Sequence, residues 1–138
     1  VLAALAYKPE EFAVGVDIFG VSNWLRTLEG IPAWWESQRL ALYTEMGDPV
    51  KDKAMLIEVS PLFHADKIRR PLFVVQGAND PRVPRSEAEQ IVAAVREKGK
   101  EVWYLVALDE GHGFQKLPHR MDLARRVVDF VGEHLRRR

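Results

Sequence analysis

The stretch Pro71-Leu-Phe-Val-Val-Gln-Gly77 is a short run of apolar residues, mostly β-branched and aromatic. It continues into Gly77-Ala-Asn-Asp80-Pro-Arg-Val-Pro84, in which glycine, asparagine, aspartate and proline are typical of a turn. Together the two patterns predict a strand over residues 71–77, with Asp80 directly after its end.

A helix is predicted after this turn, over residues 86–98. Ser86 and Glu89 match the capping-box pattern, in which each side chain accepts a hydrogen bond from the backbone N–H of the other residue at the start of a helix. The apolar residues that follow recur at helical spacing, and Gly99 is expected to end the helix.

A second apolar run, Val102-Trp-Tyr-Leu-Val-Ala-Leu108, leads into the glycine-flanked His112. A continuous apolar run of this length is typical of a strand covered on both faces. The two strands and the helix between them form a βαβ unit, which places both carboxyl ends at the ligand-binding edge of a parallel sheet. Asp80 and His112 are therefore expected to meet, and a carboxylate beside an imidazole is two thirds of a hydrolase triad.

Residues Ser60 to Pro84, together with Asp109-Glu-Gly-His-Gly-Phe114, resemble the prolyl oligopeptidase family of serine peptidases, particularly its acylaminoacyl-peptidase-like branch. The resemblance implies the C-terminal portion of an α/β-hydrolase fold, with about three parallel strands and covering helices. It implies that Asp80 and His112 are catalytic, and that Arg82 binds a carbonyl of a peptide substrate. The activity implied is hydrolysis of acylated or short peptides, and no cofactor is expected.

The sequence departs from the family where the chemistry starts, because it contains no G-x-S-x-G elbow to carry a nucleophile. Val1-Leu-Ala-Ala-Leu-Ala-Tyr7 resembles the end of the helix that follows this serine in the family. The oxyanion-hole loop and the β-propeller of the family are also absent. The resemblance therefore predicts that residues 1–138 are a C-terminal fragment of a catalytic domain, that the serine lies upstream of Val1, and that the chain alone is nearly inactive.

Ser22 is the one internal serine that follows an apolar run and would restore the hydrolase order of Ser, Asp and His. Trp24 argues against it, because the elbow requires a small residue two positions after the serine. Ser37, Ser60 and Ser86 are expected to be structural.

Two other functions stay open on the sequence. A hydrolase-like module that only binds or assembles would explain the missing serine, but it has no need of a matched Asp80 and His112. An esterase would use the same acid and base. Arg82 favours a peptidase over an esterase, on the strength of the family resemblance.

The composition gives no sign of a nucleic-acid or membrane partner, since 20 basic residues balance 20 acidic ones. The basic cluster Arg136–Arg138 is expected to cap the last helix. The N-terminal apolar residues 1–7 are too short for a targeting or transmembrane segment. The chain has no cysteine, which excludes disulfides and thiolate sites and favours a cytoplasmic location.

Metal binding is not expected, because the four histidines show no metal-type spacing. Apart from His112, they are expected to be surface or helix-face side chains. These three residues are His64, His119 and His134.

Residues Phe12 to Phe19 predict a further strand, whose apolar edge would be exposed if no neighbouring strand covers it. Such an edge is a template for pairing, so self-association through it is expected. The segment from Leu28 to Ser60 predicts short helices that lie over the ligand-binding edge as a lid or pocket wall. Within it, Trp34 and Trp35 are expected to pack in the core rather than contact substrate.

The last helix is predicted from His119 to Leu135. Apolar residues at helical spacing are expected to cover the sheet from one face of this helix. They are Met121, Ala124, Val128, Val131 and Leu135.

Overall fold

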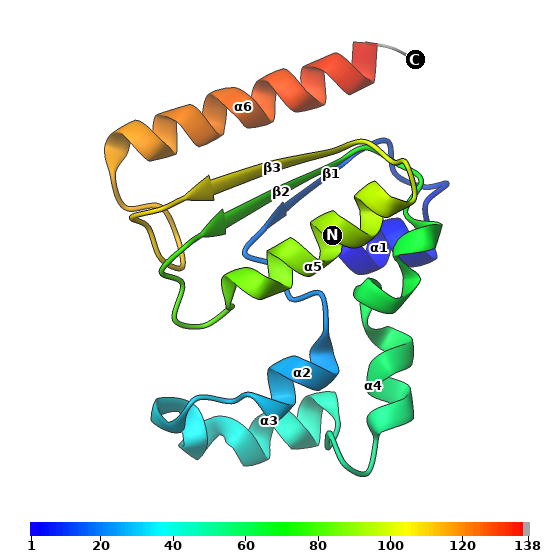
Figure 1. Cartoon of the computed structure of the whole chain (residues 1–138), viewed down its shortest axis with the longest axis vertical. Helices are drawn as coiled ribbons and strands as arrows, with labels where there is room; N and C mark the ends of the chain where they lie inside the picture. Colours follow the sequence, from blue (N-terminus) through cyan, green and yellow to red (C-terminus); the bar gives the residue numbers. More distant parts are fainter. Residues whose placement is uncertain (137–138) are drawn as a thin grey trace.

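Three parallel strands form the centre of the structure, a computed structural model that describes residues 1–136. The strands β1 (Gly15–Ile18), β2 (Leu72–Gly77) and β3 (Val102–Ala107) lie side by side in this order (Figure 1). All three carboxyl ends therefore lie at one edge, as the sequence predicted. The helices of the described residues are α1 (Leu2–Tyr7), α2 (Trp24–Glu29), α3 (Arg39–Met46), α4 (Lys53–Val59), α5 (Arg85–Glu97) and α6 (Leu117–Arg136), with the 3-10 helices η1 (Ala33–Gln38) and η2 (Pro61–Lys67).

The central strand β2 is buried along its whole length because helices cover both faces of the sheet. Phe73 and Val75 pack in the cluster that contains Phe130 of α6. Leu72 and Val74 point to the opposite face and pack in the cluster formed with α1 and α5. Figure 1 shows α6 on one side of the sheet and α1 and α5 on the other. This alternation explains why nearly every residue of β2 is apolar.

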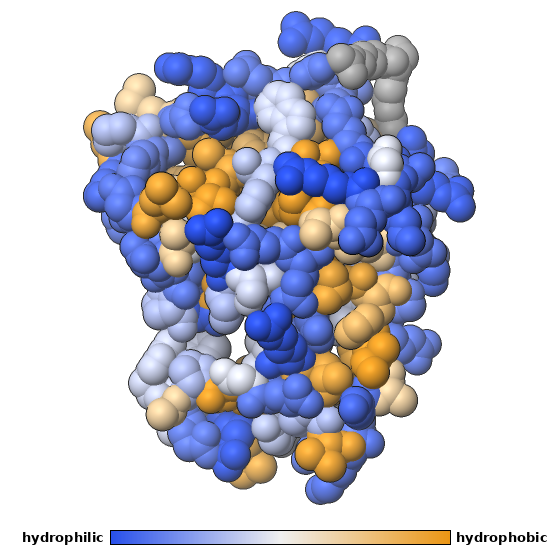
Figure 2. All heavy atoms as spheres, in the orientation of Figure 1, coloured by the Kyte–Doolittle hydropathy of each residue, from blue (hydrophilic) through white to orange (hydrophobic). Residues whose placement is uncertain are grey.

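The strand β3 is less buried than the sequence predicted. Trp103 and Leu105 pack against the α6 side, and Val102 and Tyr104 against the α5 side, yet all four are only half-buried. An edge strand has a neighbouring strand on one side only, so part of each side chain stays accessible. Figure 2, drawn from the same direction, shows hydrophobic atoms at the surface between α6 and α5.

The strand β1 lies at the other edge and is shorter than the predicted strand over residues 12–19. It pairs with β2, and among the described residues no strand pairs with its other side. Phe12 and Ile18 are 41% and 45% exposed, so apolar surface is accessible here. Self-association through this edge stays a prediction.

The helix α6 covers the sheet with a different face from the predicted one. Met121, Val128 and Leu135 are 57%, 70% and 49% exposed and Ala124 is also exposed, so the prediction for these four residues was wrong, whereas that for Val131 is confirmed. The helix carries two apolar stripes, and helical spacing alone does not distinguish them. The stripe with the large aromatic residue packs on the sheet, where the Phe130 ring lies 5.5 Å from that of Phe73. The packed residues are Leu123, Val127, Phe130 and Val131.

The C-terminal end of α6 carries the basic residues expected there. Nε of Arg136 donates to the carbonyl of Gly132 at 2.9 Å, as expected for a cation near the end of a helix. Arg137 and Arg138, the rest of the predicted cap, lie outside the described residues. Neither α6 nor any other helix within residues 1–136 is long and apolar enough to cross a membrane.

The helix α5 begins one residue earlier than predicted, and the predicted capping box is not formed. Pro84 precedes its first residue, and no side chain caps its start. Ser86 lies inside the helix, and Glu89 accepts a hydrogen bond from Nε of Arg85 at 2.7 Å. The expected stop is confirmed, because Gly99 follows the helix with a φ of +66°, which favours glycine.

A buried carboxyl group, Asp17 of β1, is expected to lower the stability of the fold at neutral pH. Burial raises its pKa from 3.8 to about 6, against the opposing effects of the Val1 α-amino group and the backbone N–H of Gly20. Between these two values the folded chain holds a proton that the unfolded chain has lost, so stability falls as the pH rises through this window. Asp17→Asn is therefore expected to raise the free energy of unfolding at pH 7 by about 1–3 kcal/mol.

Denaturant unfolding of both proteins at pH 7 and at about pH 4 measures this effect. The stabilisation by Asp17→Asn should largely disappear at the lower pH, where the carboxyl group of the folded native chain is protonated. A variant that is less stable than the native chain at pH 7 would contradict the prediction.

Candidate active site

The turns after β2 and β3 bring Asp80 and His112 together, as the parallel topology predicted. Nδ1 of His112 lies 2.8 Å from Oδ2 of Asp80. The Asp80 side chain is fully buried, whereas 32% of the His112 side chain is exposed. The carboxylate therefore holds one ring nitrogen of His112, and Nε2 is left for other chemistry.

Several hydrogen-bond donors fix the orientation of the Asp80 side chain. Its Oδ1 accepts from the backbone N–H groups of Arg82 and Val83 at 2.8 and 2.9 Å. Its Oδ2 also accepts from Nε2 of Gln76 at 3.3 Å, and the same amide donates to the carbonyl of Val83 at 3.0 Å. The role of Gln76 was not predicted from the sequence, in which the only signal was an amide side chain inside a strand of apolar residues.

Gly77 allows the turns that carry Asp80 and His112 to approach each other. A Cβ atom at this position would lie 2.2 Å from the carbonyl oxygen of Gly111 and 2.7 Å from that of Glu110, which is closer than packing permits. The backbone N–H of Asn79 donates to the carbonyl of Glu110 at 2.9 Å across the same gap. The two turns are therefore joined by backbone contacts that only glycine leaves room for.

The end of β1 also reaches this site through Phe19. Its ring lies 5.2 Å from the His112 ring and 5.7 Å from the Phe114 ring. Its φ of +57° is uncommon for an aromatic residue and directs the chain away from the strand. No sequence pattern indicated this contact, which places an apolar ring beside the imidazole.

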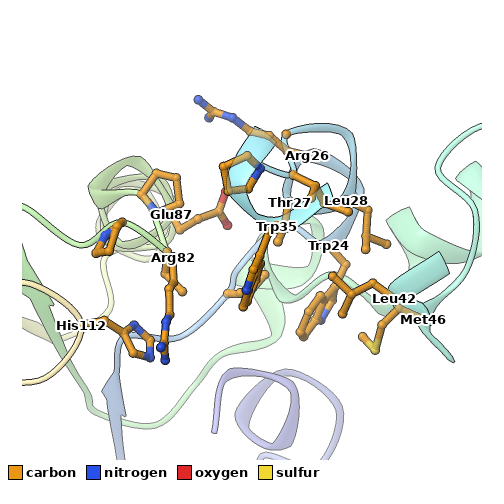
Figure 3. Close-up of a pocket in the computed structure, with 17 residues that line it drawn as sticks. Trp24, Arg26, Thr27, Leu28, Trp35, Leu42, Met46, Arg82, Glu87 and His112 are labelled. Atoms are coloured by element: carbon orange, nitrogen blue, oxygen red, sulfur yellow. The ribbon is translucent and has the colours of Figure 1, made fainter. Parts of the chain in front are cut away.

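A pocket of about 450 Å³ opens beside His112. Figure 3 shows His112 and Arg82 at one end of it, Trp24, Leu42 and Met46 at the other, and Trp35 between them. Figure 2 shows this part of the molecule as a hollow at the lower left of the surface. The pocket is lined by Val21, Trp24, Arg26, Thr27, Leu28, Gly30, Ile31, Pro32, Trp35, Leu42, Met46, Pro81, Arg82, Val83, Pro84, Glu87 and His112.

The predicted pocket wall between Leu28 and Ser60 is confirmed, because residues of η1 and α3 line the cavity. The expectation that both tryptophans pack in the core was wrong. Trp35 lines the pocket, and Trp34 is 56% exposed. Neighbouring residues of a 3-10 helix point in different directions, so the sequence pattern alone does not assign both.

Ser22 is fully buried and serves as an anchor between two elements. Its Oγ lies 2.8 Å from the carbonyl of Glu87 and 2.9 Å from Oε2 of the same residue. The backbone N–H groups of Ser22 and Asn23 also donate to this carboxylate, at 3.0 and 2.8 Å. Ser22 is thus inaccessible to a substrate, which agrees with the argument against it as a nucleophile.

The other serines have the expected structural positions. Oγ of Ser60 donates to the carbonyl of Leu56 at 2.5 Å and accepts from the backbone N–H of Trp24 at 2.9 Å. Ser37 lies exposed on η1, and Ser86 lies in the first turn of α5.

The remaining histidines are separate from one another. Nε2 of His64 lies 2.8 Å from the carbonyl of Glu58 at the surface. His134 is on a helix, as expected, but it is buried, with Nε2 3.4 Å from Oε1 of Glu101. His119 lies in the first turn of α6, directly after the loop that carries His112, and is described below.

A parallel α/β sheet with an acid–imidazole pair at its carboxyl edge, beside an apolar pocket, defines an α/β-hydrolase. The model of the prolyl oligopeptidase family matches residues 1–138, and the chain belongs to this family.

Relatives and solved structures agree with this assignment. The chain is 39% identical to dipeptidyl peptidase family member 6 of Caenorhabditis elegans over 97% of its length. It is 47% identical to dipeptidyl aminopeptidase BIII of Pseudoxanthomonas mexicana over 83% of its length. The structure of a puromycin-hydrolyzing peptidase of Mycobacterium tuberculosis superposes with a TM-score of 0.89 and 28% identity, covering 97% of this chain and 20% of that one.

The chain is much shorter than these proteins. It spans 18% of the Caenorhabditis relative and 17% of the Pseudoxanthomonas relative. Statements about the activity of the whole protein are therefore proposals.

Proposed function

We propose that this chain supplies the acid and the base of a Ser-His-Asp triad in a serine peptidase. The observation that carries the proposal is the 2.8 Å contact between buried Asp80 and partly exposed His112 at the edge of the sheet. His112 lines the pocket, so the imidazole held by Asp80 is accessible to a bound substrate. The peptidase relatives support the same reading of the site.

The proposed reaction is acyl transfer from a peptide to a serine and then to water. The serine is supplied by a part of the polypeptide outside residues 1–138, as the sequence analysis predicted. It attacks the scissile carbonyl while Nε2 of His112 takes its proton, and the imidazolium then gives that proton to the leaving amine. Asp80 holds Nδ1 of the ring and stabilises the imidazolium. Water then attacks the acyl-enzyme carbonyl while His112 takes its proton, and the same proton returns to the serine oxygen as the acyl group leaves.

The pocket suggests how a substrate is held. Its lining of Trp24, Trp35, Leu42 and Met46 fits a large apolar or aromatic side chain next to the scissile bond. Arg82 lines the same pocket near His112 and is proposed to donate to a second carbonyl of the peptide. Acylated or short peptides are the proposed substrates. The names of the dipeptidyl peptidase relatives agree with this, as does that of an acylamino-acid-releasing enzyme of Arabidopsis thaliana, which is 37% identical over 51% of this chain.

Arg82→Ala in the intact protein is expected to reduce kcat/KM for a peptide substrate by about 10- to 100-fold. A hydrogen bond from a charged donor contributes about 1.5–3 kcal/mol, and the loss should appear largely in KM if the contact is made in both ground and transition states. A simple aryl ester has no second carbonyl, so its hydrolysis should change by less than about threefold. Steady-state kinetics with an acylated peptide anilide and an aryl acetate measure both effects.

Arg69→Ala is the matched control, because Arg69 is an exposed arginine that contacts Glu10 and does not line the pocket. Equal losses on the peptide and on the ester would argue against the carbonyl contact. An intact protein that hydrolyses the ester but no peptide would favour the esterase alternative instead.

A further inference from the structure

A buried carboxylate other than that of Asp80, Glu110, lies two residues before His112 on the same loop. Only 4% of the residue is exposed. Its Oε2 accepts from the backbone N–H of Gln115 at 3.0 Å, and its Oε1 accepts from that of Lys116 at 2.9 Å. Oε1 also lies 2.8 Å from Nδ1 of His119. The carboxylate therefore closes the loop on itself, with His112 inside the closed segment.

The same residue joins the His112 loop to both of its neighbours. The backbone carbonyl of Glu110 accepts from Asn79, the residue next to Asp80. The side chain binds residues immediately before α6 and His119 in its first turn. A negative charge is favourable at the start of a long helix, and here it also fixes where the loop meets that helix. Glu110 thus connects the Asp80 turn, the His112 loop and α6.

The bonding pattern requires a carboxylate rather than an amide. Both backbone partners donate an N–H to the carboxylate, and Nδ1 of the His119 ring is placed to donate a third hydrogen bond. The backbone N–H of Gln115 has the largest effect in holding the pKa of Glu110 below its ordinary value. The backbone N–H of Lys116 and the His119 ring lower this pKa as well. A glutamine has one acceptor oxygen, so its NH₂ group would face a backbone N–H and open the loop.

We propose that Glu110 is a positioning residue that holds His112 in register with Asp80 and with the proposed nucleophile. The proposal rests on the proposed function, since it assigns Glu110 a role in placing the base of the triad. A displacement of a catalytic group by about 1 Å can cost about 10²-fold in rate, so a loop clamp of this kind affects turnover.

Glu110→Gln in the intact protein tests the proposal. We expect kcat to fall by about 10- to 100-fold, with KM changed by less than about twofold because Glu110 does not line the pocket. Glu110→Asp keeps the charge and both acceptor oxygens, so it should retain more activity than Glu110→Gln. Asp122→Asn is the control, because Asp122 is a nearby carboxylate of α6 with 43% side-chain exposure that binds Nε of Arg126 at 2.7 Å.

A double substitution separates positioning from a general loss of structure. In the His112→Ala background, Glu110→Gln should cause no further loss of residual turnover, because the residue acts through His112. A crystal structure of Glu110→Gln should show the distance between His112 Nδ1 and Asp80 Oδ2 increased or spread over several conformations.

The outcomes distinguish this inference from the proposed function. A folded Glu110→Gln variant with native kcat, beside an inactive His112→Ala variant, would overturn the inference and leave the triad in place. An active His112→Ala variant would remove the triad itself. If Glu110→Gln does not fold, two milder variants decide. Glu110→Asp shortens the side chain by one methylene and His119→Ala removes one partner of the carboxylate, so each should still lower kcat, and native kcat in both would overturn the proposal.

Discussion

Replacement of His112 by alanine is expected to reduce kcat/KM of the intact protein by at least about 10³-fold, and by up to about 10⁶-fold. The imidazole is the proposed base for the serine and the proposed acid for the leaving amine, and within residues 1–136 no second base binds Asp80 Oδ2. The loss should appear mainly in kcat, since most of the pocket lining is unchanged. Steady-state hydrolysis of an acylated peptide anilide gives both constants.

His64→Ala is the matched control for this experiment. His64 lies on η2 and contacts the carbonyl of Glu58, so its loss should change turnover by less than about twofold. Both variants need the circular dichroism spectrum and melting temperature of the native protein. A folded His112→Ala variant that keeps a tenth or more of native kcat/KM would exclude His112 as the general base.

The position of this site could be predicted because it depends on two strong local signals. An apolar run followed by turn residues marked the ends of β2 and β3, and parallel topology then required Asp80 and His112 to share an edge. Their 2.8 Å contact follows from these features with little dependence on the rest of the chain. Neither the register nor the close approach at Gly77 had to be known in advance.

The contacts that hold the two residues in place could not be predicted in the same way. Gln76 donates to the Asp80 carboxylate and to the carbonyl of Val83, and Glu110 accepts from backbone N–H groups. Backbone partners leave no trace in residue types. Glu110 was visible in the sequence only as one more charged residue in a loop. Its burial results from the packing of the Asp80 turn, the His112 loop and α6 against one another, and the spacing of apolar residues along the chain does not indicate such packing.

Predictions that required a choice between two similar local patterns were also wrong. The α6 helix offers two apolar stripes, and tertiary packing selected the one with Phe130. At α5, the capping-box pattern of Ser86 and Glu89 lost to a start at Arg85 after Pro84, because a proline at this point already fixes the backbone direction. The first case shows a weak local preference overridden by tertiary packing, and the second shows one local signal outweighed by another.

Asp80→Asn is expected to reduce kcat by about 10⁴-fold while the fold is largely retained. The asparagine oxygen can still accept from the backbone N–H groups of Arg82 and Val83, so the turn has reason to keep its shape. Its NH₂ group then faces Nδ1 of His112, which must accept a hydrogen bond instead of donating one. The proton moves to Nε2, and that nitrogen is no longer able to take the proton of a serine.

This prediction separates a tautomer effect from simple loss of the carboxylate. Asp80→Ala removes the acceptor for Arg82 and Val83 as well, so it should lower the melting temperature along with kcat, whereas Asp80→Asn should affect mainly kcat. Asp66→Asn, at an exposed aspartate of η2, controls for the change of charge. If Asp80→Asn kept native kcat, the 2.8 Å contact would be a structural bond, and the sheet edge would need a different general base.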